Sequence, residues 1–243
     1  MKENYTHISV CLDRSGSMAS MASEVTEGFN QFVEDQKKEK GKATLSLVKF
    51  DDVYESVYSF VNIKDAGKMN LDPGGSTALL DAMGTTLEET RSTVLKMKND
   101  EQPSKVIFVF ITDGEENASS KYTRKQIFEM IKDLKTDGAN DNSINWQFVF
   151  IGANQDAISE GSGYGIRAKS SITFDASGAG AKMAFSSLTK GVSSYRSNMS
   201  EAAEYTFEDK DYAIQDQLLR SKSSSKHVNG PIPTSIPDLD DNI

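Results

Sequence analysis

Strand-like and helix-like segments alternate over the first ~200 residues of the chain, and this alternation restricts the possible folds most strongly. Short apolar runs predict strands at residues 6–12, 42–50, 53–61, 106–112, 145–152 and 171–174. Apolar residues at helical spacing predict helices at residues 24–39, 77–98, 123–135 and 179–199, with a short helix from about residue 156. Only Asp51 and Asp52 separate the second and third strands, so these two strands should form an antiparallel hairpin.

This order of elements is typical of an α/β fold. It predicts a doubly wound, Rossmann-like sheet of six mostly parallel strands, with one antiparallel strand and helices on both faces. The run at residues 106–112, Val-Ile-Phe-Val-Phe-Ile-Thr, is the most apolar in the chain and should be a central strand buried on both faces.

The alternating pattern fades after residue 206, and we therefore predict a domain at 1–206 and a flexible C-terminal tail at 207–243. Residues 221–226 are a polar Ser/Lys stretch, and three of the chain's five prolines follow within seven residues. An alternative stays open for the start of the tail, where a short docked helix would use the apolar residues Tyr212, Ile214, Leu218 and Leu219.

Charge and composition exclude several function classes. The 243-residue chain has a net charge of −9, which disfavours binding to nucleic acid or to an anionic membrane surface. No apolar run approaches the ~18 residues of a membrane span, and the first residues lack the apolar stretch of a signal peptide. The single cysteine, Cys11, lies in the first strand as a core residue and permits no intrachain disulfide. We therefore expect a soluble, cytoplasmic protein.

Oxygen-bearing side chains follow the ends of two predicted strands. Asp13, Ser15 and Ser17 come directly after the strand at 6–12, and Asp113 follows the strand at 106–112. Thr77 lies near the start of a helix, after a glycine-rich loop. In sheets of this kind ligands bind beyond the carboxyl ends of the strands, so these five residues should converge. Their oxygens suit a hard cation such as Mg²⁺.

In order and spacing, the three motifs resemble the von Willebrand factor A (VWA) family over about residues 5–200. They read Asp-x-Ser-x-Ser from Asp13, Gly-Ser-Thr-Ala-Leu-Leu-Asp-Ala around Thr77, and Ile-Thr-Asp-Gly around Asp113. The chain looks most like the small stand-alone cytosolic members from bacteria and their phages. The resemblance implies an intact metal-ion-dependent adhesion site that binds Mg²⁺, with Mn²⁺ or Ca²⁺ as substitutes.

The resemblance also implies a role for each ligand and a function. Ser15 and Ser17 would bind the metal directly, Thr77 directly or through water, and Asp13 and Asp113 mostly through bridging waters. A metal held by neutral hydroxyls stays electrophilic and favours one more carboxylate, which the family takes from an Asp or Glu of a protein partner. The implied partners include an AAA+ ATPase complex or a neighbouring copy of the chain.

We therefore predict a non-enzymatic, Mg²⁺-dependent protein-interaction module. One alternative is a structural or scaffold component of a phage or host assembly. Another is a Mg²⁺-dependent phosphohydrolase, which commonly has a second Asp where this chain has Ser15, and no Lys or His is placed to replace that group. The only histidines, His7 and His227, lie in a strand and in the tail, which disfavours a zinc site or a histidine-based catalytic site.

Several charged residues lie beside the motifs, and a structural role is considered for each of them as well as a role at the metal site. Arg14 either contacts the partner's acidic group or is a solvated loop charge. Glu115 and Glu116 follow Asp113 closely, so one of them could reach the rim of the metal site, but a solvated loop is the preferred interpretation. Asp81, one helical turn beyond Thr77, should support the loops by hydrogen bonding.

Overall fold

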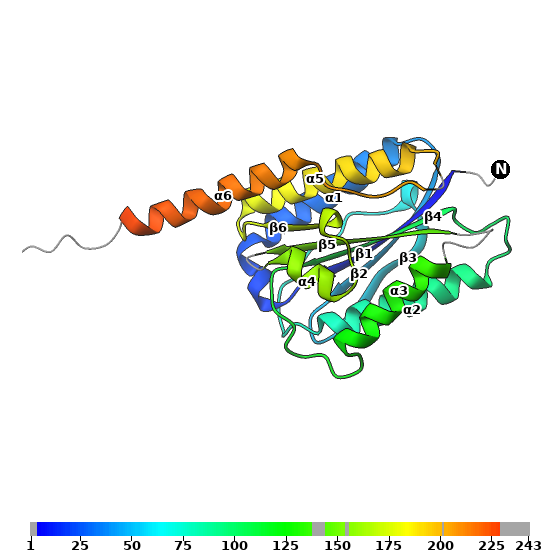
Figure 1. Cartoon of the computed structure of the whole chain (residues 1–243), viewed down its shortest axis with the longest axis horizontal. Helices are drawn as coiled ribbons and strands as arrows, with labels where there is room; N and C mark the ends of the chain where they lie inside the picture. The colour runs from blue at the N-terminus through cyan, green and yellow to red at the C-terminus, as the bar shows by residue number, and fades with distance from the viewer. Residues whose placement is uncertain (1–3, 138–143, 154–155, 201, 229–243) are drawn as a thin grey trace, which may run out of the picture.

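A single sheet of six strands forms the centre of the molecule (Figure 1). The computed structural model describes residues 4–137, 144–153, 156–200 and 202–228. The strands are β1 (Tyr5–Asp13), β2 (Lys42–Phe50), β3 (Tyr54–Asn62), β4 (Lys105–Thr112), β5 (Asn145–Ala153) and β6 (Ser171–Phe174). Their order across the sheet is β3-β2-β1-β4-β5-β6. Only the β2–β3 pair is antiparallel, which confirms the predicted hairpin and the predicted fold class.

Helices cover both faces of the sheet (Figure 1). The α-helices are α1 (Ala22–Lys38), α2 (Leu79–Lys96), α3 (Arg124–Asp137), α4 (Ala157–Gly163), α5 (Gly178–Ser197) and α6 (Asp209–Val228). The 3₁₀ turns are η1 (Gly16–Met21), η2 (Ile63–Asp65) and η3 (Ala168–Ser170). Helices α1 and α5 share one hydrophobic core with the sheet, and α2, α3 and α4 share the other.

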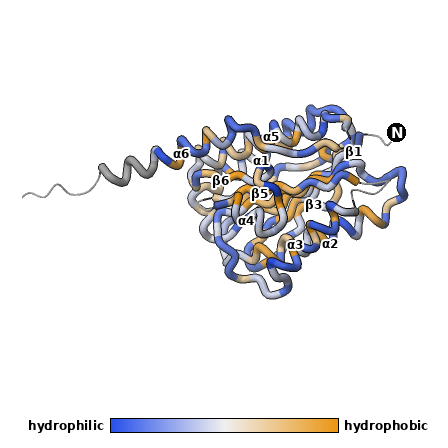
Figure 2. The backbone as a smooth tube through the Cα atoms, viewed as in Figure 1, coloured by the Kyte–Doolittle hydropathy of each residue, from blue (hydrophilic) through white to orange (hydrophobic). Residues whose placement is uncertain are grey.

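The central strands are apolar on both sides because each side faces a core. In β4, Ile107, Val109 and Ile111 point to the α1/α5 core, whereas Phe108 and Phe110 point to the opposite core. Figure 2 shows this band of hydrophobic residues through the middle of the molecule. Cys11 is fully buried in the second core, and burial raises the pKa of its thiol to about 12, as expected for a core residue.

Two helix starts differ from the sequence prediction. The turn η1 precedes α1, so helical structure begins at Gly16 rather than near residue 24, and Met18 and Met21 are buried in the core. Helix α2 begins at Leu79 rather than at residue 77. Thr77 therefore lies in the loop before the helix, two residues from its first residue.

The C-terminal region also differs from the predicted tail. Residues 209–228 form α6, whose first half packs on α5 and β6, so the structure shows the docked-helix alternative. The Asp211 carboxylate accepts a hydrogen bond from Ser187, and the Gln215 side chain bonds the backbones of Asp175 and Gly180. In Figure 1, α6 then projects beyond the rest of the molecule. Residues 229–243 of the predicted tail lie outside the described residues.

Within the part of the chain that the structure describes, no helix combines the length and the apolarity needed to cross a bilayer.

Candidate metal centre

The five predicted ligands lie at the edge of the sheet formed by the carboxyl ends of β1 and β4. These strands are parallel neighbours, and Leu12 is paired with Ile111. Asp13, the last residue of β1, is therefore beside Thr112, the last residue of β4. The loops that follow the two strands begin side by side, and this brings Asp113 to the Asp13 loop.

Hydroxyl and carboxylate oxygens meet at this edge. The Ser15 Oγ and Ser17 Oγ atoms are 3.1 Å apart, and Ser17 Oγ donates a 2.6 Å hydrogen bond to Asp113 Oδ1. Thr77 lies against the same group. A Cβ atom built onto Gly114 would be 3.1 Å from Thr77 Oγ1 and 3.5 Å from Ser17 Oγ, so both hydroxyls lie close to the same point. The structure thus brings Ser15, Ser17, Thr77 and Asp113 together, as the sequence predicted.

Asp13 is buried beneath this group and holds the loop in place. Its Oδ1 accepts a 2.6 Å hydrogen bond from the Ser15 backbone N–H, and its Oδ2 accepts one of 2.6 Å from Thr112 Oγ1. Each oxygen of the Asp13 carboxylate therefore accepts a hydrogen bond from the protein. Sequence reasoning missed Thr112, although a threonine immediately before Asp113 was visible at the end of the apolar run.

Among the described residues, no positively charged side chain contributes to the pKa shifts of the two carboxylates, Asp13 and Asp113. Burial raises the pKa of Asp13 to about 6, against the hydrogen bonds from Thr112 and Ser15 that lower it, and the nearby Asp113 raises it further. Burial also raises the pKa of Asp113, against the hydrogen bond from Ser17. Both shifts mean that the anionic forms are less stable in the protein than in water, and a bound cation would stabilise them.

The donor set fits a hard divalent cation. Two oxygens bound side by side to an octahedral Mg²⁺ are about 2.9 Å apart, since each Mg–O bond is about 2.0–2.1 Å long. The Ser15–Ser17 oxygen separation of 3.1 Å is close to this value. Among the described residues, no group of three or more His, Cys, Asp or Glu side chains could hold a metal. An ion at this edge would therefore depend on the hydroxyls.

Backbone contacts fix the glycine-rich loop against the Asp13 loop. Gly16 N–H donates to Gly75 O at 3.2 Å, and Gly74 N–H donates to Arg14 O at 2.8 Å. Gly75 has a positive φ of 69°, and a Cβ there would also collide with the Asp52 carboxylate. Glycine is thus required where the two loops approach each other.

The loop after β4 holds Thr77 and the start of α2. Thr77 and Asn117 exchange two hydrogen bonds, from Thr77 N–H to Asn117 Oδ1 at 3.0 Å and from Asn117 N–H to Thr77 O at 3.1 Å. The Glu116 carboxylate accepts hydrogen bonds from the N–H groups of Leu80, Ala118 and Ser119. The interpretation of Glu116 as a solvated loop residue was therefore wrong. Its carboxylate accepts a hydrogen bond from Leu80 N–H, in the first turn of α2, where backbone N–H groups have no partner within the helix.

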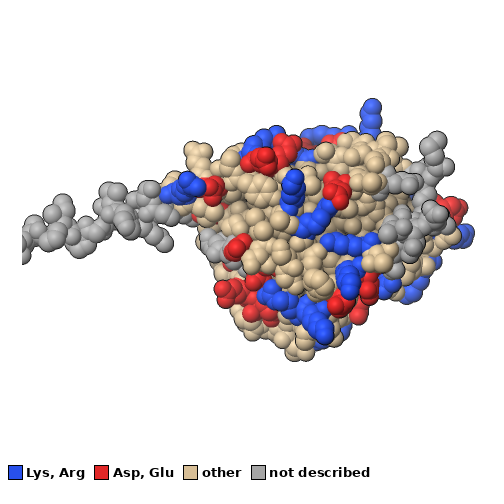
Figure 3. Space-filling view, viewed as in Figure 1, with Lys and Arg blue, Asp and Glu red and all other residues tan. Residues whose placement is uncertain are grey.

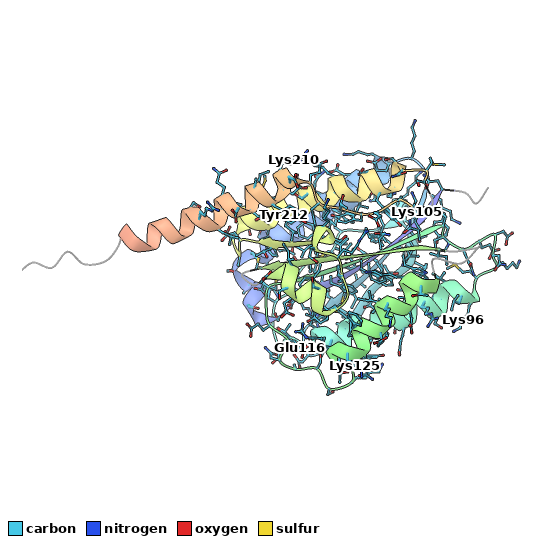
Figure 4. All side chains as sticks on the ribbon, viewed as in Figure 1. Lys96, Lys105, Glu116, Lys125, Lys210 and Tyr212 are labelled. Carbon is cyan, nitrogen blue, oxygen red and sulfur yellow. The ribbon has the colours of Figure 1, made fainter. Side chains whose placement is uncertain are left out.

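Acidic side chains gather at the lower left of the face in Figure 3, the end of the molecule where Figure 4 labels Glu116.

Asp81 supports the loop after β4, as predicted, by accepting hydrogen bonds from the backbones of Ser120, Lys121 and Tyr122. Burial alone would raise the pKa of Asp81, but these three hydrogen bonds outweigh it and the pKa is lowered.

Arg14 is tied to its own chain. Its guanidinium forms ion pairs with Asp51, at 2.9 Å, and with Glu55, and its backbone N–H donates to Phe50 O at 2.7 Å. The side chain is mostly buried rather than solvated. Arg14 therefore joins the loop after β1 to the β2–β3 hairpin, a role that neither sequence interpretation included.

Comparisons with known proteins show similarity to solved structures only. No family model matches the chain, and no curated protein matches it. Proximal thread matrix protein 1 (PTMP1) from the mussel byssus matches with a TM-score of 0.55 and 15% identity, over 79% of this chain and 46% of the mussel chain. A second PTMP1 structure, described as having a zinc-occupied MIDAS motif, matches with a TM-score of 0.54 and 16% identity, over 78% and 46%.

The ArnB paralog VWA2 from Sulfolobus acidocaldarius is less similar, with a TM-score of 0.49 and 17% identity over 76% of this chain and 44% of that chain. The chain thus spans less than half the length of each of these neighbours. At such low identity the likeness concerns the fold alone. The chain has a doubly wound, Rossmann-like α/β fold, which it shares with PTMP1.

Proposed function

We propose that this chain is a non-enzymatic module that binds a protein partner through a divalent cation held by Asp13, Ser15, Ser17, Thr77 and Asp113. One observation carries the proposal: three hydroxyls and two carboxylates from separate loops gather at the carboxyl ends of β1 and β4. When bound, the cation supplies a positive docking point for a carboxylate of the partner.

We infer that the hydroxyls are the direct ligands, because Ser17 Oγ donates its proton to Asp113 Oδ1 and keeps lone pairs for the cation. Both oxygens of Asp13 are already bonded, to Ser15 N–H and to the Thr112 hydroxyl, so Asp13 orients the loop. Asp113 orients Ser17 through its hydrogen bond to Ser17 Oγ. Neutral direct ligands leave most of the cation's charge uncompensated, and this charge attracts an acidic residue of the partner.

We infer Mg²⁺ as the ion, with Mn²⁺ and Ca²⁺ as substitutes, because hydroxyl and carboxylate oxygens are hard ligands. The zinc described at the MIDAS motif of PTMP1 shows that a protein of similar fold can hold a divalent cation. For the partner we propose a protein that offers an Asp or Glu, either in an AAA+ ATPase complex or in a neighbouring copy of this chain. The cytoplasmic location stays a prediction.

Metal binding is tested by calorimetric titration of the full chain with Mg²⁺ and Mn²⁺. Ser17→Ala removes an exposed hydroxyl that joins Ser15 to Asp113, and it should weaken binding at least tenfold. Ser76→Ala, also exposed and in the neighbouring loop, is the matched control and should bind like the wild type. Unchanged binding by Ser17→Ala contradicts the proposed ligand set.

Partner binding is tested by affinity capture from the native host with Mg²⁺ or with a chelator. The proposal expects partners that are lost in chelator and lost with Ser17→Ala but retained with Ser76→Ala. Partners that persist in both the chelator and the Ser17→Ala capture contradict a metal-bridged interaction.

A further inference from the structure

A small cavity lies directly beside the candidate metal centre. It has a volume of about 210 Å³ and lies between the β2–β3 turn, the first turns of α2 and the loop at residues 118–120. Three of its lining residues, Phe50, Ala78 and Ala82, are buried and apolar. Ala78 follows Thr77 in the chain, so the cavity begins one residue from a predicted metal ligand.

The exposed part of the lining is acidic and partly apolar. The Asp52 carboxylate is exposed and accepts a 3.3 Å hydrogen bond from Ser76 N–H. Asp81 also lines the cavity, with its carboxylate already accepting three backbone hydrogen bonds, and Val53 is 56% exposed at the turn. The third carboxylate of the lining, Asp51, is neutralised by Arg14. None of the described residues that line the cavity is a lysine or an arginine.

The volume of the cavity and the chemistry of its lining indicate which kind of group fits it. A volume of 210 Å³ corresponds to about seven water molecules. This is below the ~300–1,000 Å³ of pockets that enclose whole small molecules, so the cavity suits one side chain. An apolar floor with an acidic rim complements a side chain with an aliphatic stem and a positive end.

We propose that this cavity takes a lysine or arginine side chain of the same protein segment whose carboxylate docks at the metal centre. The inference rests on the proposed function and adds the chemistry of the partner. Because the cavity begins at Ala78, next to Thr77, the basic residue lies within a few residues of the acidic one. The partner segment therefore has an acidic and a basic residue close together, and the basic residue adds selectivity among acidic segments.

The test uses a fragment that mimics the basic side chain and needs no metal. The full chain is titrated with n-butylammonium, and with 1-butanol as the uncharged counterpart, while backbone amide NMR shifts are recorded. Butylammonium should shift the amides of Val53 and Ser120 in a saturable way, and butanol should bind more weakly. Added salt should weaken the butylammonium response.

Two variants and one control test the cavity itself. Thr85→Met fills the cavity from the half-buried Thr85 on α2 and should abolish the response. Asp52→Asn on the exposed turn should weaken butylammonium binding about threefold, as expected for an exposed charge pair. Asp72→Asn removes an equivalent exposed charge that does not line the cavity and should behave like the wild type.

Equal binding of butanol and butylammonium overturns the proposal, as does an Asp52→Asn variant that responds like the wild type. Shifts centred away from the cavity mean general ion binding and overturn it too. The amide spectrum of free Thr85→Met shows whether that variant is folded, and Asp52→Asn decides the outcome if it is not. Because no metal is added, this result is independent of the Ser17→Ala titration that tests the metal centre.

Discussion

At the scale of single residues, the buried Asp13 carboxylate organises the loop that carries Ser15 and Ser17. Its two oxygens hold the Ser15 backbone and the Thr112 hydroxyl, so its position determines where the Ser15 and Ser17 hydroxyls lie. Sequence reasoning placed Asp13, Ser15, Ser17, Thr77 and Asp113 in one group because strand ends and loop spacing are visible in the sequence. It gave Thr112 no role, although Thr112 is part of the third motif, because the hydrogen bond from Thr112 to Asp13 depends on the pairing of β1 with β4.

Thr112→Val should weaken metal binding by about tenfold while the fold is retained. The variant removes a hydroxyl that bonds a carboxylate behind the ligands, and loss of such outer contacts typically weakens metal binding 10–100-fold. Calorimetric titration with Mg²⁺ measures the effect. Thr93→Val, more than three turns along α2 from Thr77, is the control and should bind normally.

His7 should make the stability of the fold depend on pH. The ring is fully buried, stacks on Phe60 at a centroid distance of 3.7 Å and pairs with Thr44, and burial lowers its pKa to about 3. Between about pH 6.5 and pH 3 the unfolded chain binds a proton that the folded chain does not. Stability should therefore fall as the pH falls through this window, by at most about 1.4 kcal/mol per pH unit.

Urea unfolding at several pH values, compared between the wild type and His7→Phe, isolates this contribution. The phenylalanine keeps the stacking on Phe60 but does not titrate. The variant should lose less stability than the wild type between pH 6.5 and pH 4. The same pH slope in both proteins excludes His7 as the cause.

At the scale of elements, strands were easier to predict than helix boundaries. The apolar run of β4 faces a core on each side of the sheet, and that environment requires the pattern that the sequence shows. The start of α2 depends instead on Glu116, which comes from a different loop, and the turn η1 has no comparable signal. Such boundaries are determined by tertiary hydrogen bonds that a local pattern does not contain.

Glu116→Ala should destabilise the fold by about 2 kcal/mol, because it leaves N–H groups of Leu80, Ala118 and Ser119 without their acceptor. Glu115→Ala, at the exposed neighbouring position, is the matched control and should change stability by less than about 0.5 kcal/mol. Urea unfolding measures both. Equal effects from the two variants would contradict the role assigned to Glu116.

At the scale of the whole molecule, the fold class was predictable because alternating elements admit few arrangements. For α6, the sequence offered a docked helix only as an alternative to a tail. Its docking uses polar contacts, from Asp211 to Ser187 on α5 and from Gln215 to the backbones of Asp175 and Gly180. The Ser/Lys stretch at 221–226 follows these contacts. Of the apolar residues behind the docked-helix alternative, Tyr212 packs against the core, whereas Ile214 is 37% exposed. The domain therefore continues into a region that composition assigned to a tail.

Truncation separates the docked part of α6 from the rest of the C-terminal region. A chain ending at residue 221 keeps the Asp211 and Gln215 contacts and should keep the thermal midpoint of the full chain. A chain ending at residue 208 loses them, which exposes the surface of α5 that α6 covers, and it should unfold several degrees lower. Equal midpoints for the two truncations would show that α6 does not stabilise the domain.

The central claim, that hydroxyls from two loops hold a cation at the carboxyl ends of β1 and β4, is tested most directly by X-ray diffraction from crystals grown with Mn²⁺. The account predicts an anomalous peak within metal–ligand distance of the Ser15 and Ser17 hydroxyls, beside Thr77 and Asp113, that is absent in Ser17→Ala crystals. A crystal without a peak at this position, or with manganese bound elsewhere on the chain, would contradict it.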